Sequence, residues 1–233
     1  MPLPQANTLT AVLSKPASLL RHPTNFYKSW WGGKLSFYMA NINVKPSKYM
    51  HNLLHVLPAY ANEEKGVLNG LLEINTNSIN KYEFITESGH LKLDRVGYSS
   101  LTYPVAYGLI PQTWDQDGDM LDFIIANVTE PLVPGSLAEV RAIGIMKFED
   151  GGERDDKVIT VLSDDKRMDH IGSYADLGEH WQKETEHYFE HYKDLKKPGT
   201  CKVLGFFDTA EARKIISECI ERYEKEYKPK LGE

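Results

Sequence analysis

Polar and apolar residues alternate along much of the chain after residue 66, and this period-two pattern predicts β-strands. Within residues 81–85 the alternation places Lys81 and Glu83 on the same face of a strand. A turn signal at residues 87–90 follows, so this strand and the next are expected to form a hairpin. Residues 103–108 contain Pro and Gly and are predicted to form a loop. The other segments predicted as strands are 67–74, 91–95, 121–128, 138–148 and 157–162.

The pattern becomes helical in the last third of the chain. Asp176 and Glu179 can cap a helix that runs to about Leu195, and residues 200–207 form one more predicted strand. Asp208 is expected to cap a final helix. The apolar stripe of the first helix consists of Leu177, Trp181, Tyr188, Tyr192 and Leu195, and that of the second of Ala212, Ile215, Ile216, Cys219, Ile220 and Tyr223. Strands followed by late helices predict an α+β fold.

Composition excludes some classes of partner. The formal net charge of −6 argues against a nucleic-acid partner, and no apolar run is long enough to span a membrane. The two cysteines, Cys201 and Cys219, do not suggest a disulfide framework and fit a reducing compartment such as the cytoplasm.

The charge is unevenly distributed. The first 62 residues contain six Lys or Arg and no Asp or Glu, so the remainder carries a balance of −12. An acid-free, hydroxyl-rich leader could direct import into an organelle, although transit peptides are rich in Arg and this segment has only Arg21. A partner-docking arm, or a true translation start at Met39 or Met50, would account for the segment equally well.

The most acidic stretch is residues 114–122, in which four carboxylates fall within eight residues. Carboxylates this close repel one another unless cations lie between them, and oxygen ligands suit Mg²⁺, Mn²⁺ or Ca²⁺ better than zinc. The plain alternative is a solvated acidic turn. A calcium-binding EF-hand loop is excluded, because that motif requires Gly where Met120 stands and Glu where Ala126 stands.

A second acidic cluster spans residues 149–157 and also adjoins a predicted strand. Cations are interleaved among the acidic segments, at Lys81, Arg95, Lys147, Lys157 and Lys193. Carboxylates that bind metals, together with cations that bind anionic oxygens, are what a phosphoryl-transfer site requires. The two acidic loops are therefore expected to meet in one metal-dependent phosphate site.

Residues 50–227 resemble the family I soluble inorganic pyrophosphatases. The segment Asp117-Gly118-Asp119-Met120-Leu121-Asp122 is similar to that family's Asp-x-Asp-Pro-x-Asp signature, with Met120 where Pro is usual. The supporting motifs, in chain order, are Glu73, Lys81-Tyr82-Glu83, Asp94-Arg95, Tyr103-Pro104 with Tyr107-Gly108, Asp150 with Asp155-Asp156-Lys157, and His191-Tyr192-Lys193-Asp194-Leu195. The resemblance implies a catalytic domain at residues 50–233 and an accessory N-terminal arm or leader at residues 1–49.

The resemblance also implies a role for each matching residue. Asp117, Asp122 and Asp155 would bind a first metal, Asp122 would bridge to a second, and Glu73, Asp150 and Asp155 would bind those that arrive with substrate. Asp119 would accept the proton of the attacking water, and Tyr107 would donate its hydroxyl close to it. Phosphate oxygens would be bound by Lys81, Arg95, Lys157, Tyr192 and Lys193, with Glu83 and Tyr103 in support. Asp115 is the carboxylate of the run least expected to take part.

The resemblance thus implies hydrolysis of inorganic pyrophosphate by direct attack of a metal-activated water, with Mg²⁺ as cofactor and Mn²⁺ as a substitute. It implies a small five-stranded OB-like β-barrel with flanking helices, two of them in the C-terminal third, and a homo-oligomer of the compact prokaryotic type, with a hexamer favoured. Three alternatives remain open: hydrolysis of another phosphoanhydride or phosphoester, a non-enzymatic OB-type oligonucleotide-binding module, and a catalytically silent metal-binding protein. Tyr192 could equally be a core residue of its helix.

Overall fold

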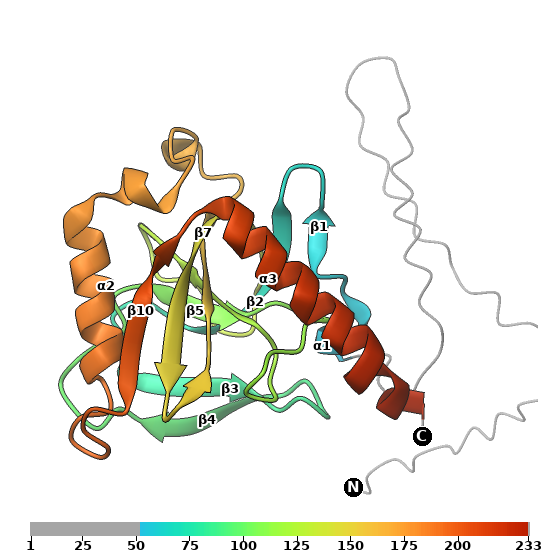
Figure 1. Cartoon of the computed structure of the whole chain (residues 1–233), viewed down its shortest axis with the longest axis horizontal. Coiled ribbons are helices and arrows are strands. Elements are labelled where there is room, and N and C mark those ends of the chain that lie inside the picture. Colours follow the sequence, from blue (N-terminus) through green and yellow to red (C-terminus); the bar gives the residue numbers. More distant parts are fainter. Residues whose placement is uncertain (1–51, 233) are drawn as a thin grey trace, which may run out of the picture. The chain divides into compact units, whose positions relative to one another are not determined.

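The structure, a computed structural model, describes residues 52–232 (Figure 1). The arm predicted at residues 1–49 lies outside the described residues. The strands are β1 Tyr60–Asn62, β2 Val67–Ile74, β3 Asn80–Phe84, β4 Leu91–Val96, β5 Ala106–Leu109, β6 Asp122–Ile125, β7 Leu137–Asp150, β8 Glu153–Arg154, β9 Lys157–Leu162 and β10 Cys201–Phe207. The α-helices are α1 Leu53–Val56, α2 Glu179–His191 and α3 Thr209–Arg222, the 3₁₀ turns are Lys166–Met168, Tyr174–Leu177 and Lys228–Gly232, and a π-helical turn spans Tyr223–Tyr227. None of the helices in residues 52–232 combines the length and apolar character needed to cross a membrane.

The main sheet is mixed and has eight strands, so the predicted number of five is wrong. Its order is β1-β2-β5-β6-β9-β7-β10, with β8 paired to β7. The strand β2 pairs with β7 as well as with β5, and β2, β5, β6, β9 and β7 therefore form a closed cycle of pairings. The predicted hairpin is confirmed as a separate two-stranded sheet of β3 and β4.

One pair of neighbouring strands in the main sheet is parallel. The strand β6 runs alongside β9 in the same direction, and its first residue, Asp122, is the register partner of Lys157, the first residue of β9. Parallel neighbours begin at the same edge of a sheet. The acidic loop before β6 and the acidic loop before β9 therefore reach the same place in the fold.

Several predicted boundaries need correction. Ala106–Leu109 is the strand β5 rather than part of a loop: Pro104 lies before the segment that pairs with β6, and Gly108 permits the close approach of β2 on the other side. Helix α2 begins at Glu179 rather than at Asp176: Asp176 closes a capping box with Ser173 in a 3₁₀ turn, and Gly178, at φ 87°, breaks the chain direction before the α-helix. Leu195 was predicted to be buried but lies beyond the end of α2 with 74% of its surface exposed.

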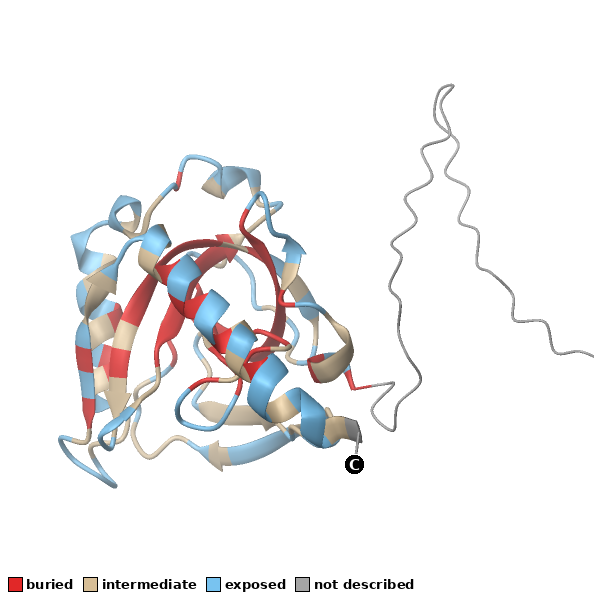
Figure 2. Ribbon diagram, turned by 45° about the vertical axis from the view of Figure 1, so that its right-hand side comes forward, coloured by how far each residue is buried: buried red, intermediate tan, exposed pale blue. Residues whose placement is uncertain are grey.

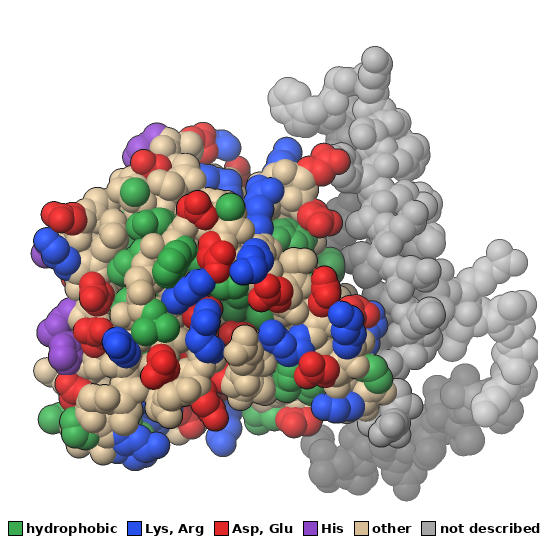
Figure 3. Space-filling model, viewed as in Figure 1, with side chains coloured by type: hydrophobic (Ala, Val, Ile, Leu, Met, Phe, Trp, Pro, Cys, Tyr) green, Lys and Arg blue, Asp and Glu red, His purple; other side chains and the backbone are tan. Residues whose placement is uncertain are grey.

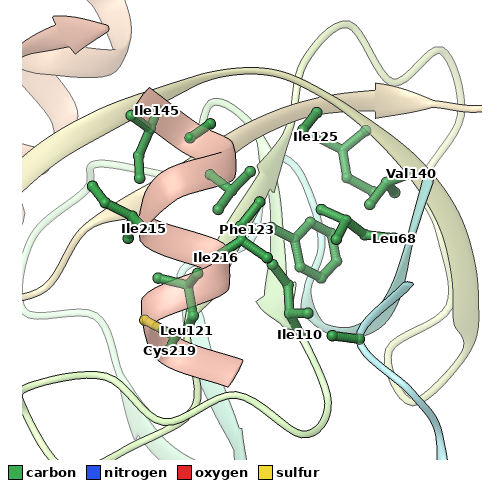
Figure 4. Packing of buried hydrophobic residues seen from close by; sticks show 14 of the residues in the cluster. Leu68, Ile110, Leu121, Phe123, Ile125, Val140, Ile145, Ile215, Ile216 and Cys219 are labelled. Carbon is green, nitrogen blue, oxygen red and sulfur yellow. The ribbon is translucent and has the colours of Figure 1, made fainter. Parts of the chain in front are cut away.

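The core has two principal parts. One lies between α3 and the strand cycle, where the predicted stripe of α3 packs against residues such as Leu68, Leu121 and Phe123 (Figure 4). Buried residues accordingly concentrate in the strands and on the inner side of α3 (Figure 2). The other part packs Tyr188 and Phe189 of α2 against side chains of β2, β7 and β9. These two helices fix the strands from which the polar side chains described next extend.

Candidate active site

A pocket of about 350 Å³ lies where the two acidic loops meet. Eight of its lining residues are carboxylic acids, contributed by five strands and the loops before β6 and β9. These acids are Glu73, Glu83, Asp117, Asp119, Asp122, Asp150, Glu153 and Asp155. Lys81 and Tyr107 line the same pocket. All the residues expected to bind metal, together with Asp119 as the expected proton acceptor, are therefore gathered in one place.

A buried lysine links the two loops. Lys157, only 1% exposed, donates from Nζ to Asp122 Oδ2 at 2.7 Å and also contacts Asp155 Oδ1. The hydroxyl of Tyr107 donates to the same oxygen of Asp122. Asp122 from one acidic loop and Asp155 from the other are thereby held by one ammonium group. The expected role of Lys157 in binding phosphate stays a prediction, because in this structure its hydrogen bonds go to carboxylates.

The crowding of carboxylates shifts their proton affinities. Burial raises the pKa of Glu73 well above its usual range, and the nearby Asp122 adds to the shift. Burial and then the neighbouring Asp155 raise the pKa of Asp122 against the opposing effect of Lys157. Burial acts in the same direction on Asp155, but Lys157 outweighs it and lowers that pKa. The pocket thus holds more negative charge than its own cations neutralise.

The oxygen atoms of this pocket are of the ligand type that Mg²⁺ prefers. Every acidic group offers oxygen ligands, and the eight carboxylates outnumber the three lysines that pair with them, Lys81, Lys157 and Lys193. Within residues 52–232 no three His, Cys, Asp or Glu side chains close around a single-ion position. Mg²⁺ does not require such a cage, since it is typically bound through one or two carboxylates and completed by water and phosphate oxygens.

Glu73 joins the hairpin to the main sheet. It lies in β2, all eight residues of which are buried, and its Oε1 accepts a hydrogen bond of 2.8 Å from the backbone nitrogen of Phe84 in β3. On β3, Lys81 forms an ion pair of 2.6 Å with Glu83. The hairpin thus brings a cation and a carboxylate of its own to the pocket.

Cations and aromatic residues border the acidic pocket. Arg95 donates from Nη1 to Asp94 at 2.5 Å, whereas its Nη2 is buried and has no hydrogen-bond partner among the described residues. Lys193 contacts Asp150 Oδ2. Arg95 and Lys81 line a smaller hollow together with Tyr103 and Tyr192. A buried guanidinium nitrogen without a partner is a donor available to an anion.

Tyr192 takes part in both the core and this border. Its ring stacks on that of Tyr188 at 5.5 Å and packs against the cluster around Phe189, as the core interpretation requires. It also lines the hollow beside Arg95. The rings of Tyr103 and Tyr107 contact each other with centroids 5.8 Å apart, and the hydroxyl of Tyr107 donates to Asp122.

The sequence and the fold match those of known proteins. A family model for inorganic pyrophosphatase matches residues 70–224. An inorganic pyrophosphatase of Neisseria meningitidis serogroup A is 45% identical over 163 residues, which are 69% of this chain and 91% of that protein. The chain belongs to the inorganic pyrophosphatase family. The resemblance noted in the sequence is thereby confirmed.

Other members of the inorganic pyrophosphatase family agree in sequence and fold. That of Geobacillus stearothermophilus is 44% identical over 161 residues, covering 69% of this chain and 96% of its own length. The crystal structure from Neisseria gonorrhoeae superposes with a TM-score of 0.71 at 39% identity and covers 74% of this chain and 99% of that one. The structure from Thermus thermophilus gives a TM-score of 0.69 at 39% identity, with the same coverage.

The surroundings of two acidic residues, Glu153 and Asp115, were not predicted from the sequence. Glu153 lines the pocket, and its position inside the acidic run at residues 149–157 was the only available signal. Asp115 was expected to matter least, yet it is only 7% exposed and pairs with Arg222 at 3.5 Å. No pattern in the sequence connects Asp115 with Arg222, which lies 107 positions further along the chain.

Proposed function

We propose that this protein hydrolyses inorganic pyrophosphate to two orthophosphate ions, with Mg²⁺ as its cofactor and Mn²⁺ as a substitute. The observation that carries the proposal is the pocket, in which eight carboxylates, six of them from the two acidic segments, meet Lys81 in a chain of the inorganic pyrophosphatase family. Pyrophosphate is a polyanion, so a site for it needs both acids that hold metal ions and cations that bind its oxygens.

The assignment of metal ions to individual carboxylates follows the family resemblance, and all of these carboxylates line the pocket. Asp117, Asp122 and Asp155 would hold the first ion, and Asp122 would share a second. Glu73, Asp150 and Asp155 would hold the ions that accompany the substrate. When bound, these ions neutralise phosphate charge and acidify water near the substrate.

The chain's own side chains would bind the substrate and move the proton. Asp119 lies on the exposed rim of the pocket, with Oδ1 held at 2.8 Å by the backbone nitrogen of Met120, and would accept the proton of the attacking water. The water oxygen bonds to one phosphorus atom as the bond from that phosphorus to the bridging oxygen breaks, and the second phosphate leaves. Tyr107 would place its hydroxyl beside the attacking water.

Phosphate oxygens would be bound by the cations that border the pocket. The unpartnered Nη2 of Arg95 supports its role as a phosphate donor. Lys81, Lys157, Tyr192 and Lys193 would bind further oxygens. Glu83, paired with Lys81, and Tyr103, beside Tyr107, would hold these donors in place.

The finer features of fold and assembly are proposals on the same basis. We propose that the cycle β2-β5-β6-β9-β7 corresponds to an OB-like barrel, that residues 50–233 form the catalytic domain and residues 1–49 an accessory arm, and that the protein assembles as a homo-oligomer, with a hexamer favoured. Sedimentation velocity on the full chain tests the assembly: a monomer would contradict it. The two free, buried cysteines support a cytoplasmic location, with organelle import through the N-terminal segment as the alternative.

Phosphate release from pyrophosphate tests the central proposal. We expect rapid release with Mg²⁺ and no release with EDTA; negligible rates under both conditions would refute it. Tripolyphosphate and ATP, assayed in parallel, separate pyrophosphate hydrolysis from a general phosphoanhydride hydrolase. Binding of single-stranded nucleic acid is disfavoured, because the pocket is acidic and the face shown in Figure 3 carries interspersed acidic and basic side chains rather than a basic groove.

A further inference from the structure

The acidic loop at residues 115–119 is anchored to the rest of the protein at its first residue. Gln116 to Asp119 are exposed. Apart from the bond from the backbone nitrogen of Met120 to Asp119 Oδ1, their hydrogen bonds to other described residues stay within the loop. Asp115 accepts from Gln116 and Gly118, and it donates its own backbone nitrogen to Asp119 O at 2.6 Å. Asp117 Oδ1 accepts from the backbone nitrogen of Asp119 at 3.1 Å. The loop therefore forms one closed turn around Asp115.

Asp115 and its neighbour Trp114 are held by the end of helix α3. Arg222 donates from Nη1 to the carbonyl of Trp114 at 2.6 Å and lies 3.5 Å from Asp115 Oδ1. The thiol of Cys219 lies 3.6 Å from the same carboxylate oxygen. The backbone nitrogen of Trp114 donates to the carbonyl of Cys219 at 3.0 Å. One turn of α3 thus makes four contacts with two adjacent residues.

These contacts differ from ordinary surface pairs. Asp115 is 7% exposed and Cys219 is 1% exposed, and Cys219 lies in the same core cluster as Leu121 (Figure 4). A buried carboxylate must be paired, which fixes both the carboxylate and its partner. Helix α3 therefore fixes the position of Asp115, and the hydrogen bonds of the closed turn fix Asp117 and Asp119 relative to Asp115.

We propose that Arg222 and Asp115 are positioning residues that hold the loop carrying Asp117 and Asp119 in the geometry needed to bind a divalent cation. The inference rests on the proposed function for the identity of the cation and of the reaction. Neither residue touches the pocket. They act as the outer support of a metal-binding loop, a class of contact whose loss typically weakens metal binding by about ten- to a hundredfold.

The test compares four variants with the full-length wild-type protein. Arg222→Met keeps the length of the side chain and removes its charge and its donors, and Asp115→Asn removes the charge of the partner. Arg222→Lys restores a cation but lacks the planar guanidinium, whose Nη1 contacts both Trp114 and Asp115. Lys225→Met is the matched control, because it breaks an exposed ion pair with Glu221 on the next turn of the helix.

Calorimetric titration with Mn²⁺ alone, at 25 °C and without substrate, is the primary measurement. We expect Arg222→Met and Asp115→Asn to bind Mn²⁺ about tenfold more weakly than wild type. Arg222→Lys should lie between these variants and wild type, and Lys225→Met should equal wild type. The Mg²⁺ concentration that gives half-maximal pyrophosphate hydrolysis should rise by the same factor, with less change in the rate at saturating Mg²⁺.

The outcomes separate the two proposals. If Arg222→Met and Asp115→Asn melt at lower temperature but bind Mn²⁺ as wild type does while folded, their role is stability alone and the positioning proposal is overturned. A wild-type protein that binds no Mn²⁺ overturns it as well. If wild type binds Mn²⁺ and the variants bind it weakly, but pyrophosphate is not hydrolysed, positioning is supported and the proposed function fails. If Arg222→Met does not fold, Arg222→Lys and Asp115→Asn decide the question.

Discussion

Lys157 is the side chain that pairs with carboxylates of both acidic loops. The ammonium group of Lys157 lies between Asp122 and Asp155. Burial alone would lower the pKa of Lys157, but these two carboxylates outweigh that effect and raise the pKa above its usual range. A charged group this deeply buried persists only while its partners remain ionised. The residue therefore neutralises part of the repulsion that bound metal ions would otherwise have to offset.

Replacing Lys157 with Met should destabilise the metal-free protein strongly. Two carboxylates whose side chains are only 17% and 20% exposed would lose their cation, and breaking a buried pair costs about 3–5 kcal/mol. Urea unfolding in EDTA should show this loss, and saturating Mg²⁺ should recover much of it because the ions supply the missing charge. Lys166→Met, at an exposed pair with Asp164, serves as the control and should change little. An equal loss with and without Mg²⁺ would contradict the argument.

Asp119→Asn should abolish most turnover while leaving the fold intact. The amide keeps the size of the side chain but cannot accept the proton of the attacking water, and such general-base effects are worth about 10²–10⁴-fold. Initial rates of phosphate release measure the effect, and circular dichroism checks the fold. Asp164→Asn, at a fully exposed aspartate, is the matched control. A fully active Asp119→Asn protein would exclude this residue as the base.

At the level of the elements, the sequence predicted most strands because their burial pattern is regular. The bounds of β2 and β9 agree with the predicted ranges, since both are apolar-rich segments flanked by glycine or polar residues. The strand β5 was missed because its four residues, Ala106 to Leu109, are too short a run to stand out beside Pro104. The short strands β1 and β8 and the helix α1 gave no periodic signal either.

The candidate site was more predictable in its members than in its connections. The acidic clusters and the interleaved cations, Arg95 included, stand out in the sequence through charge density, and family motifs added the tyrosines. The partners of those residues depend on contacts between distant segments: the bond from Lys157 to Asp122 follows from the parallel register of β6 and β9. The tie between Asp115 and α3 depends on where the last helix packs. The local sequence pattern contains no information on either of these contacts.

Gly108→Ala should disrupt the pairing of β5 with β2. A methyl group at this position would lie 2.1 Å from the carbonyl oxygen of Leu71, so the backbones must separate. We expect a loss of about 3 kcal/mol in the free energy of unfolding, measured by urea denaturation. Gly172→Ala is the control, because its added methyl would meet only Asp176 Oδ2, at 3.7 Å. Equal stability of the two variants would show that β2 and β5 can separate without cost.

On the scale of the whole molecule, excess acid in one pocket predicts that cation binding depends on pH. Desolvation and then the charge of Asp155 raise the pKa of Asp117 to about 7. A raised pKa means that this carboxyl still holds protons near neutral pH, and a metal ion must displace them. Affinity for Mg²⁺ should therefore increase as pH rises from about 6 to 8 and decrease below that window.

Calorimetry in buffers of different ionisation enthalpy measures this effect as protons released per ion bound. Release should be greatest near pH 6 and should fall towards pH 8, where the carboxyl is already ionised. The variant Asp117→Asn should release fewer protons at the lower pH. Identical Mg²⁺ affinity across the window would contradict the argument.

The parallel pair of β6 and β9 also has a consequence for the order of folding. Asp122 and Lys157 are 35 positions apart, and β7 must pass between them in sequence before the pair can form. Contacts of such separation close late, because the intervening chain must first be ordered. A cation that needs both acidic loops would then find its binding geometry only in a nearly native chain. Its contribution would appear as slower unfolding and a longer lifetime of the folded state, rather than as faster folding.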